Sequence, residues 1–234
     1  MQWADWEPMD REIRATFGYG ADADREAARR LHALAPRPSR WRDLRAALRN
    51  RRDIVVLGCG PDLGHVQASH LAGRTVVACD GASRRLMEIG APPSVVVTDL
   101  DGDPEGLRWA AAAGAYLVVH AHGDNVSQLE ALVPALGPLV LGTYATAPDE
   151  HLAPLRSLGG FTDGDRAVVL LEDVEARHAT LVAFQFDAEP SRYSHRWDPE
   201  TKPRKLGFAR RVVEDVARRG RLSLAHWRPP GADG

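Results

Sequence analysis

The segment TDLDGD at 98–103 carries the clearest chemical signal in the sequence, because two of its carboxylates stand two residues apart. Asp99 and Asp101 follow a run of valines, which predicts that they lie at the end of a buried strand. Two carboxylates on one side of the chain favour a hard cation, and Mg²⁺ typically takes one or two carboxylates together with phosphate oxygens of a substrate. The alternative is an acidic turn, since Asp and Gly both favour turns, and Asp103 is expected to cap the next helix.

Carboxylates also follow the neighbouring apolar runs, in CDGAS at 79–83 and in HAHGDN at 120–125. Together with the first pair, Asp80 and Asp124 could form an acidic pocket, which needs cations to be stable. One or two of these carboxylates could instead hydrogen-bond an amino heterocycle, because carboxylates accept well from paired N–H groups.

The two alternating histidines of HAHGDN raise the question of zinc. His120 and His122 have no third ligand of suitable spacing, so we expect structural or substrate-contacting histidines instead. Asn125 ends the same segment, and Thr143 ends the next apolar run in GTYAT at 142–146. Substrate contacts are therefore predicted for His122, Asn125 and Thr143.

The segment GCGP at 58–61 is a glycine-rich turn between a predicted strand and a predicted helix. Such a turn lets backbone N–H groups approach a phosphate, and the helix N-terminus adds a positive field. The segment lacks the Lys of a Walker loop and the third Gly of a dinucleotide fingerprint, so a plain tight turn is the alternative. The residues that would cradle a phosphate are Gly58, Cys59, Gly60 and Pro61.

Two further segments carry candidate residues. GGFTDGDRA at 159–167 offers Thr162, Asp163, Asp165 and Arg166. Of these, Thr162, Asp163 and Asp165 could cap a helix, bind substrate, or do both. The chain has 30 basic residues, of which only two are lysines, and both lie in the late segment KPRK at 202–205. A compact ammonium at these positions could serve where a planar guanidinium does not. Lys202, Arg204 and Lys205 would suit a polyphosphate, because lysines and Mg²⁺ spread the charge of a phosphoryl transition state, although a solvated loop is the alternative.

The elements that must position these residues alternate between short apolar runs and helical patterns. Apolar runs of this kind predict strands buried on both faces, and spacings of about 20 residues leave room for crossover helices. The predicted fold is therefore α/β, a mostly parallel Rossmann-like sheet with flanking helices, whose ligands bind at the carboxyl ends of the strands. The predicted strands span 53–58, 75–80, 94–99, 115–120, 138–143 and 180–187, and the helices between them span 62–72, 82–89, 104–113 and 125–136.

The ends of the chain follow other patterns. Residues 1–50 are predicted to form a helical N-terminal segment, broken by APRPS at 35–39, and residues 51–234 an α/β catalytic domain. Trp3, Trp6 and Trp41 are expected to be packing residues. The stretch 163–179 could contain a strand, but its apolar spacing favours a helix; then follow a predicted loop at 188–203, a helix at 206–220 and a final strand at 222–227.

Composition limits the classes of function. The chain has 234 residues, 44% of them hydrophobic, with 30 basic and 32 acidic side chains and a net charge of −2. This balance argues against a general nucleic-acid or membrane-surface binder. No apolar run approaches the roughly 20 residues that span a bilayer, and the first residues lack the basic and apolar regions of a signal peptide, so none is expected there. Cys59 and Cys79 are too few for a disulfide scaffold, so a cytoplasmic location with reduced thiols is expected.

Taken in order, these segments resemble a known family. Their order and spacing are similar to those of the archaeal 6-hydroxymethyl-7,8-dihydropterin pyrophosphokinases. The segments that carry this resemblance are GCGPDL, CDGAS, VVTDLDGD, HAHGDN, GGFTDGDRA and KPRKLGFARRVV, together with an opening that holds Trp3, Trp6 and the FGY at 17–19. The resemblance to thiamine pyrophosphokinases is more distant and rests on DGA followed by Asp-x-Asp. It implies a thiamine-pyrophosphokinase-like sheet.

The resemblance implies an Mg²⁺-dependent transfer of diphosphate from ATP to the hydroxymethyl group of a reduced pterin, giving the pterin diphosphate and AMP, in tetrahydromethanopterin or folate synthesis. Asp99 and Asp101 would hold Mg²⁺, with Asp80 as a third ligand or Asp124 assisting. Lys202 and Lys205 would neutralise the transferred group, and Arg204 would assist the phosphate loop. ATP and the pterin are the expected partners, and a homodimer is possible.

Some features depart from the family pattern, and other functions remain open. Cys59 and Asp62 stand where the family is expected to have a small residue and a Ser, and an acidic side chain there puts the phosphate contact in question. The alternatives are a thiamine pyrophosphokinase, a metal-dependent nucleotide-sugar transferase and a non-catalytic nucleotide-binding module. Thiamine pyrophosphokinases usually carry a further β-rich domain, which the pattern after 188 does not predict.

Overall fold

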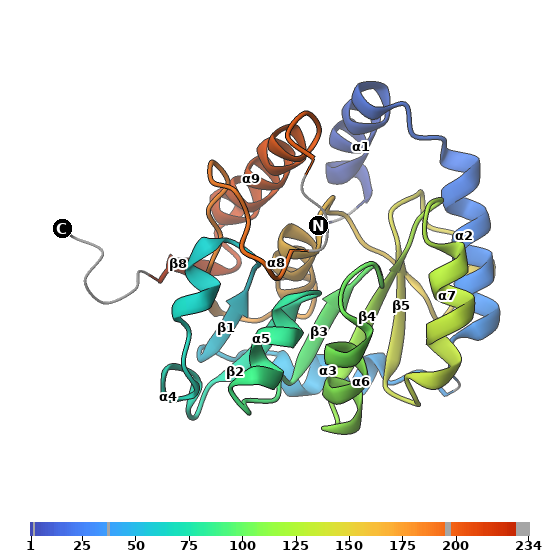
Figure 1. Ribbon diagram of the computed structural model, residues 1–234. Helices are drawn as coiled ribbons and strands as arrows, with labels where there is room; N and C mark the ends of the chain where they lie inside the picture. The colour runs from blue at the N-terminus through green and yellow to red at the C-terminus, as the bar shows by residue number, and fades with distance from the viewer. Residues whose placement is uncertain (2, 37, 195–197, 228–234) are drawn as a thin grey trace.

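The computed structural model describes residues 1, 3–36, 38–194 and 198–227. Within them, eight strands form one sheet in the order β6-β5-β4-β3-β2-β1-β7-β8, and every neighbouring pair is parallel. The predicted α/β fold with a parallel sheet is therefore confirmed (Figure 1). The strands are β1 Ile54–Leu57, β2 Thr75–Cys79, β3 Val95–Thr98, β4 Tyr116–Ala121, β5 Val140–Tyr144, β6 Arg156–Ser157, β7 His178–Val182 and β8 Ser223–His226.

Helices cover both faces of the sheet, as the apolar strands require. One core joins α2 Ala21–Leu34, α4 Ala68–Leu71, α5 Ala82–Glu88, α6 Pro104–Ala112 and α7 Val126–Leu132 to side chains such as Val55 and Leu57. The other core joins α1 Trp3–Phe17, α3 Trp41–Leu48, α8 Asp163–Asp173 and α9 Lys202–Arg219 to Ile54 and Val56. Successive residues of a strand thus point into opposite cores.

The helical N-terminal segment is confirmed as α1, α2 and α3. Trp6 and Trp41 are buried in the second core and Trp3 packs against it, as expected of packing residues. Ala27, Ala28 and Leu31 of α2 lie in the first core instead. The division of the chain into 1–50 and 51–234 stays a prediction, and residues 228–234 at its end lie outside the described residues.

Several predicted boundaries were wrong. The helix expected over 62–72 is a 3-10 turn, η1 Pro61–His65, followed by the short α4, and the helix expected over 125–136 ends at Leu132 because Pro134 cannot continue it. A helix does form over the ambiguous stretch, but α8 ends at Asp173, and β7 occupies 178–182 rather than 180–187. Strand β6 was not predicted, since its two residues are polar.

The last helix begins earlier than predicted, which changes the setting of the lysines. The loop predicted over 188–203 includes residues 195–197, which lie outside the described residues, and it ends where α9 begins at Lys202. Pro203 is well tolerated there, because the first helical turn does not use its missing N–H. Lys202 and Lys205 therefore stand in the first turn of a helix. The final strand is confirmed as β8.

The strand order reverses beside β1. The chain leaves β1 toward β2 on one side, whereas β7, on the other side of β1, continues away to β8. Loops that diverge from neighbouring parallel strands leave a crevice at the carboxyl edge of the sheet. Among the described helices, none is long and apolar enough to cross a membrane.

Candidate active site

A cleft of about 510 Å³ lies at the carboxyl edge of the sheet. Its walls come from the segments after β1, β2, β3, β4 and β7, from the start of α8, and from α1, α2 and α9. All the predicted site residues line it except Pro61, Thr143 and Arg204. The sequence segments that looked chemically active therefore do meet in one place.

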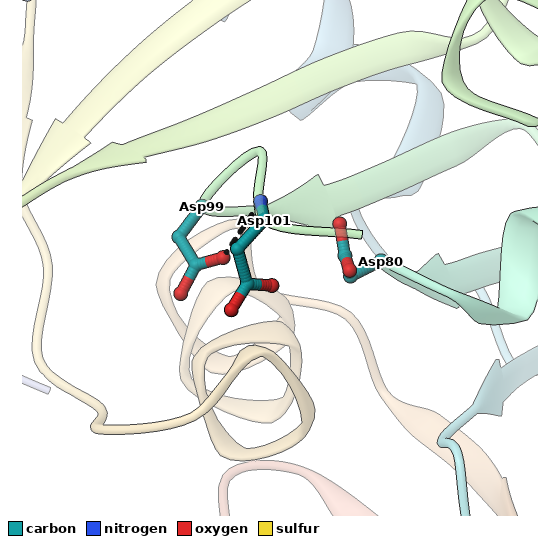
Figure 2. Close-up of side chains that lie close together, drawn as sticks. All are labelled: Asp80, Asp99 and Asp101. Carbon is teal, nitrogen blue, oxygen red and sulfur yellow. Dashed lines mark hydrogen bonds between the residues drawn. The ribbon is translucent and has the colours of Figure 1, made fainter. Parts of the chain in front are cut away.

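Three carboxylates meet at the ends of β2 and β3. Asp80, Asp99 and Asp101 each offer an oxygen, and these oxygens all lie within 4.8 Å of one another (Figure 2). Leu100 allows this arrangement, because its φ of 69° turns the chain between the two aspartates that follow β3. The turn is held by two N–H groups: that of Leu100 donates to Thr98 Oγ1 at 2.8 Å, and that of Asp101 donates to Asp99 Oδ1 at 3.3 Å.

Asp80 is the buried member of this carboxylate triad. Its Oδ1 accepts the hydroxyl of Thr98, and the backbone of Gly102 also hydrogen-bonds its carboxylate. Gly102 must be a glycine, since a Cβ there would stand 1.8 Å from Asp80 Oδ2. Burial, and then the charges of Asp99 and Asp101, raise the pKa of Asp80 to about 8.

The pKa of Asp99 is shifted in the opposite direction, downward. Burial tends to raise its pKa, but the hydrogen bond with His122 and the charge of Arg166 outweigh burial and hold the pKa of Asp99 below its usual range. Three carboxylates this close cannot all ionise cheaply by themselves, and a divalent cation among them would remove that penalty. The donor set therefore fits Mg²⁺, which takes carboxylate oxygens and leaves further positions to phosphate or water.

The segment after β4 fixes the backbone and side chain of Asp99. Asn125 Nδ2 donates to the carbonyl oxygens of Asp99 and His120, at 2.7 and 2.8 Å, and its Oδ1 accepts the N–H of His122. His122 Nε2 lies 3.4 Å from Asp99 Oδ2, and its Nδ1 accepts the N–H of Asp124. Asn125 and His122 thus orient a metal-ligand candidate, while the Asp124 side chain is exposed at the cleft.

His120 and Thr143 form a buried pair beneath this segment. His120 Nδ1 and Thr143 Oγ1 are 3.1 Å apart, and Thr143 also donates to the carbonyl of Val119. Burial holds the pKa of His120 well below its usual value, so the imidazole is neutral. Since Thr143 does not line the cleft, its predicted substrate contact stays a prediction, and its observed contacts support His120 instead.

The start of α8 supplies both a cap and a buried cation. Asp165 accepts from the N–H and hydroxyl of Thr162, so both side chains complete a capping box. Asp163 faces Arg166, whose Nη1 lies 3.3 Å from Asp163 Oδ1 and 3.9 Å from Asp99 Oδ2. Burial, and then Asp99 and Asp80, raise the pKa of Asp163 well above its usual range. Arg166 was noted in the sequence segment but was given no role, although it stands three residues after Asp163 on the same helix.

The glycine-rich turn after β1 is used for packing. The N–H groups of Gly58 and Gly60 donate to the carbonyls of Val182 and Ala183, each at 2.9 Å. A Cβ at either glycine would stand 2.6 Å from the carbonyl oxygen of Ala183, so both glycines permit the close approach of β7. The predicted phosphate contacts of Gly58, Cys59, Gly60 and Pro61 stay predictions, and these two N–H groups already have partners.

The two cysteines, Cys59 in this turn and Cys79 at the end of β2, are free thiols. Cys59 Sγ donates to the carbonyl of Cys79 at 3.4 Å. Burial raises the pKa of Cys59 to about 12 and raises that of Cys79 well above its usual range. Neither thiol is therefore activated as a nucleophile.

The first turn of α9 brings two of its three cations to the cleft. Lys202 and Lys205 line it, and Lys205 Nζ lies 5.7 and 5.9 Å from the ring centroids of Phe161 and Tyr19. Arg204 turns away: its Nη2 donates to the carbonyl of Thr16 at 3.4 Å, and its guanidinium stands 5.2 Å from the Phe17 ring. Its predicted phosphate contact stays a prediction.

The largest omission of the sequence interpretation is the wall formed by α1 and α2. Trp6, Asp10, Ile13 and Arg14 of α1 line the cleft, as does Asp24 of α2. The spacing of the α1 residues, at positions i, i+4, i+7 and i+8, marks one helix face, but nothing in the sequence indicated that this face meets the strand ends.

No family model matches the chain. It is 37% identical to a protein of Pyrococcus furiosus over 234 residues, which cover 96% of this chain and 98% of that one. It is 33% identical to a protein of Methanothermobacter thermautotrophicus, with 96% and 98% covered, and 29% identical to one of Methanocaldococcus jannaschii, with 91% and 95% covered. Each of the three is named 6-hydroxymethyl-7,8-dihydropterin pyrophosphokinase.

Proposed function

The chain belongs to the 6-hydroxymethyl-7,8-dihydropterin pyrophosphokinase family, and on this premise we propose that it transfers diphosphate from ATP to the hydroxymethyl group of a reduced pterin. The products are the pterin diphosphate and AMP, and the reaction depends on Mg²⁺. The observation that carries the proposal is the triad of Asp80, Asp99 and Asp101 in a cleft whose other wall presents Lys202 and Lys205.

The reaction asks the protein mainly for positioning and charge neutralisation. The hydroxyl oxygen of the pterin forms a bond to the β-phosphorus of ATP, the bond from that phosphorus to the bridging α,β-oxygen breaks, and AMP leaves. The hydroxyl proton passes to a base, for which the cleft offers several carboxylates. Mg²⁺ held by the triad would neutralise phosphate charge. Lys202 and Lys205 would bind the non-bridging oxygens of the transferred group.

The residues around the triad support this assignment. Asn125, His122 and Arg166 hold Asp99 in an ionised and fixed position, which a metal ligand requires. Both cysteines are thiols of raised pKa, so the transfer is proposed to be direct, without a covalent enzyme intermediate. Placement in tetrahydromethanopterin or folate synthesis, in the cytoplasm, belongs to the same proposal.

The test is an assay with ATP, Mg²⁺ and 6-hydroxymethyl-7,8-dihydropterin in which AMP and the pterin diphosphate are quantified. We expect the two products in equal amounts, AMP formation only when the pterin is present, and loss of turnover when Mg²⁺ is chelated. ADP as product would contradict diphosphate transfer, and AMP formed with thiamine but not with the pterin would move the substrate to another alcohol. Asp187→Asn, an exposed carboxylate outside the cleft, is the matched control for variants of the triad.

A further inference from the structure

The face of α1 that lines the cleft carries donor groups that lack partners. Trp6, Asp10, Ile13 and Arg14 form this face, which we call the α1 face. Among the described residues, neither Trp6 Nε1 nor Arg14 Nη1 has a hydrogen-bond partner, although both atoms are buried. Buried donors are almost always satisfied in folded proteins, and these two belong to side chains that line the cleft.

Trp6 is the more deeply buried of the two, with 2% of its surface exposed. It packs against Gly159, where a Cβ would stand 2.9 Å from Trp6 Cδ2, so the ring has little freedom to turn toward another partner. Leaving an indole N–H buried and unbonded destabilises the fold, because the lost hydrogen bond to water is not replaced. A ligand acceptor at the α1 face would replace that hydrogen bond.

Arg14 and Asp10 supply a donor and an acceptor beside Trp6. Arg14 Nε donates to Asp10 Oδ2 and its Nη2 to Asp24 Oδ2, each at 2.8 Å. Burial raises the pKa of Asp10 in spite of the neighbouring Arg14. The guanidinium is thus fixed between two carboxylates, its remaining Nη1 has no partner among the described residues, and both side chains line the cleft.

The α1 face is also tied to the carboxylate triad. Asp24, which holds Arg14, accepts the N–H of Gly123 through its Oδ1 at 2.8 Å. Gly123 belongs to the same segment as His122 and Asn125, which hold Asp99. A group bound at the α1 face would therefore be held at a fixed place relative to the triad.

The α9 wall and the α1 face of the cleft differ in charge, so they favour different ligands. Lys202 and Lys205 stand on α9, whereas the α1 face and its neighbour Asp24 present carboxylates, a guanidinium already paired with them, and an indole N–H. A triphosphate is attracted to the lysines and repelled by the carboxylates. An uncharged ring with both N–H groups and acceptor oxygens or nitrogens fits the α1 face.

We propose that the α1 face binds the heterocycle of the alcohol substrate, reading a 2-amino-4-oxopyrimidine edge through Trp6, Asp10 and Arg14. The Asp10 carboxylate accepts from the amino and ring N–H groups, and the unbonded donors of Trp6 and Arg14 meet the acceptor atoms of the ring. This inference rests on the proposed function, because it takes the pterin as the diphosphate acceptor. It makes Trp6, Asp10 and Arg14 determinants of acceptor specificity.

The test measures binding of the two substrates separately. The α,β-methylene analogue of ATP cannot transfer diphosphate, so the affinity of the pterin can be measured by calorimetry in its presence with Mg²⁺. We expect Asp10→Asn to weaken pterin binding at least about tenfold and Trp6→Phe to weaken it about threefold to tenfold. The affinity of each variant for the Mg²⁺ analogue complex, measured without the pterin, should change less than about twofold.

Two controls match these variants. Glu7→Gln removes an exposed carboxylate of α1, and Trp41→Phe removes another buried indole N–H that has no partner among the described residues but lies outside the cleft. Neither should change pterin binding. Unchanged pterin affinity in Asp10→Asn and Trp6→Phe, or equal weakening of both ligands, would overturn the inference.

Melting temperatures guard against loss of fold, and either of the two variants suffices for the test. A different result would contradict the proposed function rather than this inference. A wild-type protein that binds the analogue but not the pterin would contradict the choice of substrate.

Discussion

The ends of β3 and β4 differ from the end of β1 in what their polar segments do. At β3 and β4, the side chains of Asp99, Asp101 and Asn125 carry the interactions, and they converge on the cleft. At β1, the glycines of the turn use their N–H groups to hold β7. Two segments that both suggested a function in the sequence therefore differ in the structure: polar side chains meet at the cleft after β3 and β4, whereas backbone groups pack against β7 after β1.

The comparison teaches that a glycine-rich turn at a strand end is evidence of close approach, but not of what approaches. Here the Ala183 carbonyl already occupies the space that a Cβ would need at Gly58 and Gly60. Carboxylates that meet within 4.8 Å are stronger evidence, because their mutual repulsion requires a cation or a proton. The predictions that follow test this difference between the two regions.

The largest loss of turnover is expected for a substitution in the carboxylate triad. Asp99→Asn removes the ionised oxygen that His122 and Arg166 hold in place, so turnover should fall by about a thousandfold or more. Steady-state AMP formation measures it, with Asp187→Asn as the control. An Asp99→Asn variant that keeps a tenth of the wild-type rate would remove the triad from the mechanism.

A smaller effect is expected at Asn125, which touches the triad only through the Asp99 backbone. Asn125→Ala frees the carbonyls of Asp99 and His120, and activity should fall by about tenfold to a hundredfold, as for residues that orient metal ligands. The Mg²⁺ concentration for half-maximal rate should rise as well. A fall in activity with an unchanged Mg²⁺ dependence would mean that Asn125 acts on something other than the metal site.

The glycine turn should respond in stability. Gly58→Ala places a methyl group 2.6 Å from the Ala183 carbonyl, which should lower the free energy of unfolding by about 1–3 kcal/mol. Gly64→Ala is its control, since a Cβ there meets nothing within 4 Å. Urea denaturation compares the two, and equal stability would refute the packing role of Gly58.

The stability of the metal-free protein should depend on pH through Asp80. Its folded pKa of about 8 is raised above its ordinary value of 3.8, so the folded state binds the proton more tightly and loses stability as pH rises through this window. Asp163, whose pKa is also raised, acts in the same direction. The melting temperature in chelator should be a few degrees lower at pH 8.5 than at pH 5.5, and Asp80→Asn should reduce the difference. A melting temperature that rises over this range would contradict the assigned shift.

The smallest effect is expected at Cys59. Its thiol makes one hydrogen bond to the Cys79 carbonyl and its pKa is raised, so Cys59→Ala should change the turnover rate less than about twofold. A loss of tenfold or more would return the glycine turn to the chemical part of the site. AMP formation at saturating ATP and pterin measures it.

Much of the site could be predicted from the sequence because the carboxyl ends of parallel strands share one edge. Asp80, Asp99 and Asp124 each follow an apolar run, and from that pattern we predicted that they lie close together. All three line the cleft. The neighbours of β1 could not be predicted in the same way, because β7 is far along the chain and its pairing depends on the sheet order. The bonds of the Gly58 and Gly60 N–H groups were therefore missed.

The α1 face was missed for a related reason. The amphipathic spacing of Trp6, Asp10 and Arg14 indicates a buried helix face, but which surface covers it is decided by tertiary packing. The lysines illustrate a local error instead. Lys202 was placed in the predicted loop over 188–203, whereas α9 begins at Lys202, and Pro203 is compatible with its first turn.

The most direct test of the central claim is a titration with Mn²⁺ in place of Mg²⁺, in the presence of the α,β-methylene analogue of ATP. Free Mn²⁺ is followed by electron paramagnetic resonance for the wild type, Asp101→Asn and Cys59→Ala. We predict that the wild type and Cys59→Ala bind Mn²⁺ with the same affinity, that Mg²⁺ displaces it, and that Asp101→Asn binds at least about tenfold more weakly. Equal Mn²⁺ affinity in the wild type and Asp101→Asn would contradict the claim that the carboxylates at the ends of β2 and β3 hold the catalytic metal.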